Sequence, residues 1–86
     1  MKIIFHKHFE KHYIKLPNSM KEKFKERRDI FLQNQYDSLL NNHALTGRYV
    51  GCRSINITSD WRVIFEEIDE QTVKFVNIGT HSQLYG

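Results

Sequence analysis

The chain has 86 residues, 40% of them hydrophobic and 13% aromatic, with one proline and one cysteine. This length and composition exclude a multidomain or disordered protein, so we expect a single domain over residues 1–86. The lone cysteine excludes an internal disulfide, and no apolar run is long enough for a signal peptide or a membrane span, which predicts a soluble cytoplasmic protein. The formal net charge of +3 leaves the nature of any anionic partner open.

The first elements expected from the N-terminus are a short strand and a short helix. Residues 3–5 form an apolar run typical of a strand. Phe9, Tyr13 and Leu16 then recur at helical spacing, so they share one face of an amphipathic helix. Pro17 disfavours helical backbone at Leu16, and we expect the helix to end there.

A second helix is expected directly after the proline. Ser19 and Glu22 have the spacing of a capping box, in which the two side chains satisfy backbone donors of the first turn. An apolar stripe continues through about Asn34, formed by Met20, Phe24, Ile30 and Phe31. The two helices are therefore predicted to form an antiparallel hairpin.

The rest of the chain is predicted to form a small sheet. Residues 34–46 show no sustained period and are expected to connect helices to sheet. Apolar residues then alternate with period two, predicting strands over residues 52–57, 61–66 and 73–78. The expected order is βααβββ with a short C-terminal tail, an α+β fold in which the helical hairpin packs on a mainly antiparallel sheet.

The charge is concentrated in the helical part. Residues 1–28 hold seven Lys and two Arg against three Glu, a net charge of +6, whereas residues 44–86 hold one Lys and three Arg against five acidic residues, a net charge of −1. A polyanion is expected to meet the N-terminal part first. A lysine-rich helix face that is simply solvated is the alternative interpretation.

Two candidate sites in the sequence are weak. His6, His8 and His12 invite a metal site, but no carboxylate or cysteine has matching spacing, so we expect no metal. Cys52 lies in an alternating strand pattern, and nothing in the sequence indicates an adjacent base that would make it a nucleophile. No glycine loop that cradles phosphate is present, and no cofactor is expected.

The C-terminal half holds side chains suited to acid–base chemistry on a phosphate. Asp60 follows a predicted strand, and His81 and Tyr85 lie four residues apart near the C-terminus. Asp and His transfer protons near neutral pH. Structural roles remain an alternative, because Asp60 is also a good turn residue and a tail aromatic often only anchors the tail. Arginine can neutralise phosphate charge bidentately, which makes candidates of Arg48, Arg53 and Arg62.

Three motifs in this half carry a resemblance to a known family. They are a His-x-Leu-x-Gly run at residues 43–47, a Gly-x-Arg run followed by Asp-Trp-x-x-Ile-Phe within residues 51–65, and the ending Gly-Thr-His-Ser-x-Leu-Tyr-Gly at residues 79–86. In this order, behind two helices, they make the chain resemble the RelE/ParE toxin superfamily of type II toxin-antitoxin modules, and within it the YafQ-like mRNA interferases. The resemblance spans nearly the whole chain and implies a RelE-like fold.

The resemblance also implies a function and a set of site residues. Such a toxin is a ribosome-dependent endoribonuclease that cuts messenger RNA in the aminoacyl site without a metal, through attack of the RNA 2′-hydroxyl on phosphorus. His43, Asp60 and His81 match the family's catalytic residues, and Tyr85 matches an aromatic residue that holds the substrate. Asn56 stands where the family has a further histidine, so proton transfer at that position is lost.

Roles and partners follow as hypotheses. His81 is expected to be the main general acid, while Asp60 and His43 act as base or orienting groups and Arg53 contacts the phosphate. The basic helix, at Lys21, Lys23 and Lys25, is expected to dock on ribosomal RNA. The implied partner is an antitoxin of ribbon-helix-helix type in a heterotetramer. A ParE-like inhibitor of DNA gyrase and a catalytically weakened antitoxin-binding module are the alternatives.

Overall fold

Strands, helices and short 3₁₀ turns alternate along the chain in the computed structural model, which describes residues 1–86. In chain order the elements are β1 (Lys2–Phe5), α1 (Lys7–Tyr13), α2 (Asn18–Gln33), the 3₁₀ helix η1 (Ser38–Leu40), β2 (His43–Ala44), the 3₁₀ helix η2 (Gly47–Tyr49), β3 (Arg53–Asn56), β4 (Trp61–Asp69), β5 (Thr72–Thr80) and α3 (His81–Tyr85). The predicted α+β class is confirmed.

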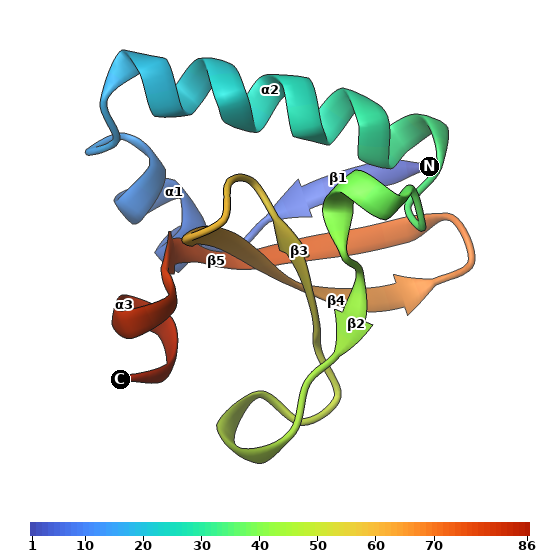
Figure 1. Ribbon diagram of the computed structural model, residues 1–86. Helices are drawn as coiled ribbons and strands as arrows, with labels where there is room; N and C mark the ends of the chain where they lie inside the picture. The colour runs from blue at the N-terminus through green and yellow to red at the C-terminus, as the bar shows by residue number, and fades with distance from the viewer.

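The strands form one mixed sheet in the order β1-β5-β4-β3-β2 (Figure 1). Only β1 and β5 run parallel, which agrees with the mainly antiparallel sheet that was predicted. The fifth strand was missed, because the stretch expected to be a plain connector contains β2, whose two residues pair with Arg53 and Ser54. Two residues are too few for a period-two pattern to be visible in a sequence.

The two N-terminal helices start in different ways. The ring of His6 caps α1, where its Nδ1 accepts a hydrogen bond from the backbone N–H of His8 at 3.0 Å. The capping box predicted at Ser19 and Glu22 is wrong, because α2 begins two positions earlier than that box implies, with Pro17 as N-cap and no side-chain cap. Proline suits a helix start, since its fixed φ matches helical backbone and its missing N–H needs no partner there.

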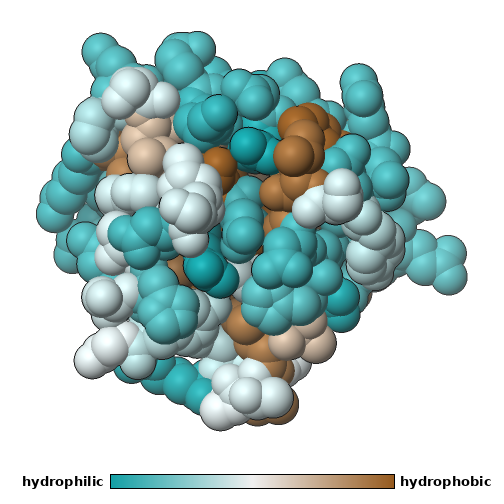
Figure 2. Space-filling model, in the orientation of Figure 1, coloured by the Kyte–Doolittle hydropathy of each residue, from teal (hydrophilic) through white to brown (hydrophobic).

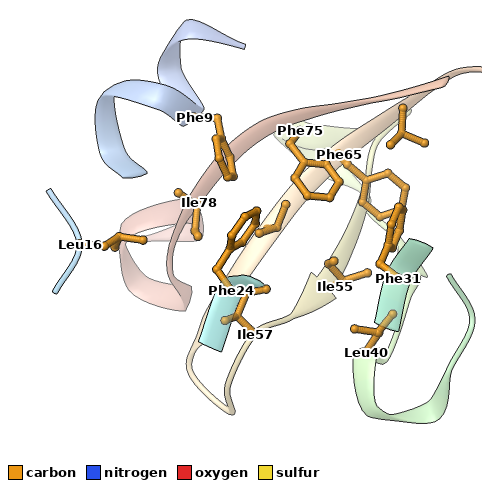
Figure 3. Packing of buried hydrophobic residues seen from close by; sticks show 12 residues of the cluster. Phe9, Leu16, Phe24, Phe31, Leu40, Ile55, Ile57, Phe65, Phe75 and Ile78 are labelled. Carbon is orange, nitrogen blue, oxygen red and sulfur yellow. The ribbon is translucent and has the colours of Figure 1, made fainter. Parts of the chain in front are cut away.

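Aromatic rings hold the α1–α2 layer to the sheet (Figure 3). The ring of Phe75 on β5 lies 5.8 Å from Phe9 of α1, and 6.0 and 5.6 Å from Phe24 and Phe31 of α2. Phe65 on β4 packs edge-on against Phe31 at 5.1 Å. All five rings are at most 3% exposed. Because each buried ring stabilises the fold by about 1.5–3 kcal/mol, this cluster is the main link between helices and sheet.

The C-terminal tail differs from the prediction, because it forms a helix. Helix α3 lies on the side of the sheet opposite to α2 (Figure 1).

The molecular surface seen in the orientation of Figure 1 is mainly hydrophilic, with hydrophobic residues in small separate patches (Figure 2). None of the helices combines the length and the apolar character that a membrane span requires.

Candidate active site

The sheet face opposite to α2 carries three of the predicted site residues, His43, Asn56 and Arg62. Ile55 is fully buried in the core on the helix side. Because side chains alternate along a strand, its neighbour Asn56 points to the other face, together with Arg62, which pairs with Asn56 across β3 and β4. His43 pairs with Ser54, two residues before Asn56, and so lies on the same face. We call this surface, which carries His43, Asn56 and Arg62, the open face.

Two of these side chains have unused hydrogen-bonding capacity. The Oδ1 atom of Asn56 and the Nε atom of Arg62 are buried and have no partner. The Nη2 atom of Arg62 donates to the backbone carbonyl of Ser59 at 3.2 Å, which holds the guanidinium beside the turn between β3 and β4. Since buried polar groups are normally paired, this spot favours binding of a polar ligand or water.

The Gly-Thr-His ending positions the C-terminal helix on β5. A Cβ atom at Gly79 would lie 3.0 Å from Oε1 of Gln83 and 3.4 Å from Cδ2 of Leu84, so a glycine allows the close approach of α3. Thr80 and Gln83 form a reciprocal capping box at the start of the helix. Leu84 is 1% exposed and anchors the helix. The small and apolar members of the motif therefore fix the position of His81 at the start of α3.

Four of the predicted site residues come together around this helix. The backbone N–H of His81 donates to the carbonyl of Asp60 at 3.0 Å, which ties α3 to the turn before β4. The ring of Tyr85, one turn further along α3, lies 4.8 Å from the His81 ring. A guanidinium N–H of Arg48 donates to the carbonyl of Leu84 at the end of α3. An imidazole, a phenol and a guanidinium thus gather at one end of the open face, and the backbone of Asp60 is tied beside them.

Tyr49 belongs to this cluster and was missed by the sequence reasoning. Its ring packs at right angles to Tyr85, with 5.9 Å between centroids, and the guanidinium of Arg48 lies 5.3 Å from its centroid. The signal that could have found it is its place beside an arginine in a loop flanked by glycines. Gly47 and Gly51 both have positive φ, at 66° and 91°, so they allow the turns that bring the loop to α3.

His43 lies on the open face but outside the cluster around α3. Its Nδ1 atom forms a hydrogen bond of 2.8 Å with the backbone carbonyl of Asn41. No hydrogen bond or ring contact joins His43 to Asp60 or His81. The predicted catalytic residues therefore form two groups on one side of the sheet.

Arg53 lies apart from both groups. It precedes Ser54 by one residue, so its side chain points to the helix side of the sheet. There its Nε atom donates to Oδ1 of Asn42 at 2.8 Å, and its guanidinium lies 5.7 Å from the centroid of the Tyr36 ring. The structure does not bring Arg53 together with Arg48 or the histidines.

The three predicted docking lysines lie on α2, which the sheet separates from the open face. Lys23 and Lys25 form exposed ion pairs with Glu26 and Glu22, at 3.8 and 3.5 Å. The Nζ atom of Lys21 donates to the carbonyl of Ile14 at 3.3 Å. Exposed pairs of this kind contribute little to stability, so these side chains remain available to a polyanion.

The two weak candidate sites gain no support from the structure. His6, His8 and His12 do not share a ligand geometry, since His12 is hydrogen-bonded to Asn77 and no three potential ligands meet anywhere in the chain. Burial, and secondarily Glu66, raises the pKa of the Cys52 thiol, while Lys74 opposes the shift. A raised pKa leaves the thiol protonated at neutral pH, which is the opposite of what a nucleophilic cysteine requires.

The whole chain matches one protein family. The profile described as "Bacterial toxin of type II toxin-antitoxin system, YafQ" matches residues 1–86. Among solved structures, YafQ from E. coli strain BL21(DE3) superposes with a TM-score of 0.80 at 23% identity, covering 99% of this chain and 98% of that chain. The E. coli DinJ-YafQ toxin-antitoxin complex gives a TM-score of 0.77 at 24% identity, covering 99% and 97%.

A more distant toxin has the same fold. The YoeB/ParE toxin from Agrobacterium tumefaciens superposes with a TM-score of 0.76 at 19% identity, covering 94% of this chain and 99% of that chain. These likenesses confirm the predicted RelE-like fold. No curated protein sequence matches the chain. Because the family profile extends over all 86 residues, the chain belongs to the YafQ family of bacterial toxins of type II toxin-antitoxin systems.

Proposed function

We propose that this toxin is a ribosome-dependent endoribonuclease that cuts messenger RNA in the aminoacyl site and thereby stops translation. The observation that supports the proposal best is the cluster of Asp60, His81, Tyr85 and Arg48 at one end of the open face. Two proton-transfer groups, an aromatic ring and a cation are the components that RNA cleavage by acid–base chemistry needs. His43 adds a second imidazole on the same face.

The proposed reaction uses the RNA's own hydroxyl as nucleophile. The 2′-oxygen attacks the adjacent phosphorus while a base takes its proton, and a new bond forms between the 2′-oxygen and phosphorus. The bond from phosphorus to the 5′-oxygen breaks, and an acid gives its proton to that leaving oxygen. The products are a 2′,3′-cyclic phosphate and a 5′-hydroxyl. Cationic side chains stabilise the charge on the phosphorane, and the scheme calls for no metal ion or other cofactor.

Each side chain has a stated role in this scheme. His81 is the general acid, and Asp60 and His43 act as base or orienting groups. Tyr85 stacks on a base of the RNA, since an aromatic ring can hold an unstacked nucleotide. The phosphate is bound by Arg48 and Arg62. At the position of the family's further histidine, Asn56 can donate to or accept from a phosphate or sugar but cannot transfer a proton.

Replacement of His81 by alanine tests the function. A positioned acid or base typically contributes about 10²- to 10⁴-fold in rate, so His81→Ala should slow cleavage of ribosome-bound message by that factor and relieve growth arrest. Ser82→Ala is the matched control, because Ser82 is an exposed neighbour whose side chain has no hydrogen bond in the structure. Primer extension on message from expressing cells measures the cuts. Cleavage by His81→Ala at the unmutated rate would contradict the assignment.

The antitoxin and the cellular setting belong to the same proposal. The E. coli DinJ-YafQ complex and the heterotetrameric YoeB-YefM complex from Staphylococcus aureus are toxin-antitoxin assemblies of similar fold. We propose a cognate antitoxin of ribbon-helix-helix type, which forms a heterotetramer with this chain and blocks access to ribosomes. The toxin would act in the cytoplasm as one domain. Growth rescue by the product of the neighbouring reading frame tests this partner.

The same primer-extension experiment separates the two alternatives. Codon-phased cuts in message support the endoribonuclease. Induction of the DNA-damage response without cuts would indicate a ParE-like inhibitor of DNA gyrase. Absence of both, with antitoxin binding retained, would indicate a weakened module, an outcome that Asn56 in place of the family histidine makes worth testing.

A further inference from the structure

Arg53 is the one predicted phosphate ligand that points away from the open face. Its Nε–H donates to Oδ1 of Asn42 at 2.8 Å in a partly buried setting, and its guanidinium lies over Tyr36 on the helix side. We propose that Arg53 is a positioning residue that acts through Asn42 to hold His43, and that it does not touch the RNA. This proposal rests on the proposed function, because it concerns the placement of His43 for RNA cleavage.

The Asn42 side chain is held at both ends. Its Oδ1 atom accepts from Arg53, and its Nδ2 atom donates to the backbone carbonyl of Gln35 at 2.9 Å. Both partners fix the orientation of the amide, since a guanidinium N–H can only donate and a carbonyl can only accept. A hydrogen bond to a charged donor is stronger than one between neutral groups. The Asn42 side chain, directly before His43, is therefore clamped between β3 and the turn that follows α2.

The residue on the other side of Asn42 supplies the contact to the imidazole. Asn41 has a left-handed backbone, with φ 47° and ψ 49°, a conformation that asparagine adopts more readily than most residues. Its carbonyl lies 2.8 Å from Nδ1 of His43. A carbonyl oxygen has only lone pairs, so Nδ1 must carry the hydrogen.

This contact sets the protonation pattern of the ring. With the hydrogen on Nδ1, the neutral imidazole has its free lone pair on Nε2, and no group of the protein binds that atom. Nε2 is thus the atom of His43 that can take a proton from the RNA or hold the RNA by a hydrogen bond. We call the group formed by Arg53, Asn42 and the left-handed Asn41 the holder. It keeps the His43 ring in one tautomer and one orientation.

A double-mutant cycle distinguishes a holder from a phosphate contact. Arg53→Met and Asn42→Ala break the same hydrogen bond from opposite ends. Because a displacement of about 1 Å can cost roughly 100-fold in rate, each variant should slow cleavage on programmed ribosomes by about 10- to 100-fold, and the double variant no more than the slower single one. Independent roles would make the two factors multiply. Thermal melts of the variants check that each one folds.

Nitrogen NMR of the histidine ring gives a second measurement, which needs no ribosomes. In the free protein labelled with ¹⁵N-histidine, long-range correlations should show a protonated Nδ1 and an unprotonated Nε2 for the neutral His43 ring. In Arg53→Met and in Asn42→Ala this pattern should give way to a mixture of both tautomers. A purely structural contribution of the clamp to stability would leave the tautomer unchanged.

The outcomes separate this inference from the proposed function. An unmutated protein with the hydrogen of His43 on Nε2 would overturn the holder, whatever the cleavage result. Multiplicative losses with an unchanged tautomer would also overturn it. A protein that cuts no message, but shows the Nδ1–H tautomer and loses it in both variants, would support the holder while refuting the endoribonuclease.

Discussion

Removal of the Leu84 side chain tests how α3 is held against the sheet. Leu84 is 1% exposed and lies outside the core cluster of the helix side. A buried Leu→Ala substitution costs about 2–5 kcal/mol. Ordering the backbone of a five-residue helix costs about 1–2 kcal/mol per residue, or roughly 5–10 kcal/mol in all. The free energy that docks α3 on the sheet is therefore a small difference between a large burial term and a large ordering term. Leu84→Ala should release the helix without unfolding the core.

The release can be measured at one amide. The backbone N–H of His81 donates to the carbonyl of Asp60, so it is protected only while α3 is docked. Leu84→Ala should cost about 2 kcal/mol of docking free energy. Because each 1.4 kcal/mol changes the docking equilibrium about tenfold, hydrogen exchange at this amide should become roughly 30-fold faster. Cleavage should fall by about 100-fold, because His81 and Tyr85 lose their positions.

A matched leucine in the core gives the control. Leu16 is 8% exposed and belongs to the cluster between helices and sheet. Leu16→Ala should lower the melting temperature by about 4–8 °C for each kcal/mol lost, with exchange at His81 nearly unchanged at moderate temperature. Leu84→Ala should lower the melting temperature less than Leu16→Ala does. An unchanged exchange rate at His81 and full cleavage in Leu84→Ala would refute the argument that Leu84 positions the cluster.

Three further predictions concern the charged helix, the family departure and the cysteine. Replacing Lys21, Lys23 and Lys25 together by glutamine should weaken ribosome binding. The slope of the log binding constant against log salt concentration should become shallower by roughly 0.7–0.9 per lost phosphate contact. Binding that is unchanged across a salt titration would indicate that these lysines form only a solvated helix face. Asn56→His should keep or raise the single-turnover cleavage rate, whereas a large drop would show that the asparagine has a role of its own. The pKa of the Cys52 thiol is raised in the folded protein above its value in the unfolded chain. Its contribution to the free energy of unfolding should therefore be complete below the pKa of the unfolded thiol and be lost as pH rises through the pKa of the folded thiol. The urea midpoints of Cys52→Ser and the unmutated protein should then converge in alkaline solution, and an equally steep fall in both would argue against this linkage.

Long periodic segments of the chain were predicted well. The stripe that includes Phe24 and Phe31 identified α2 and its buried face, and both rings lie in the core. Period-two alternation identified β4 and β5, although each strand extends beyond its predicted bounds. Such patterns are visible because one face of a helix or strand is buried over many residues.

Two short elements, β2 and α3, were not predicted, because the forces that form them are tertiary. Strand β2 exists through its pairing with Arg53 and Ser54, and α3 through the burial of Leu84 and the space at Gly79. The Ser19 capping box failed for a local reason, since the preceding proline already provides a helix start. A capping pattern in a sequence does not tell which of several nearby positions is the cap.

The sequence alone determined the fold class, the family and the residue types of the candidate site, because periodicity and motifs are local properties. Only the tertiary structure decided which of these residues meet. Tyr49 lies 36 positions from Tyr85 yet their rings are in contact, because the glycines of one loop turn it toward α3. Arg53 and Ser54 are adjacent in sequence but point to opposite faces, since a strand alternates its side chains. That alternation separates Arg53 from the open face, where the chemistry is proposed to take place.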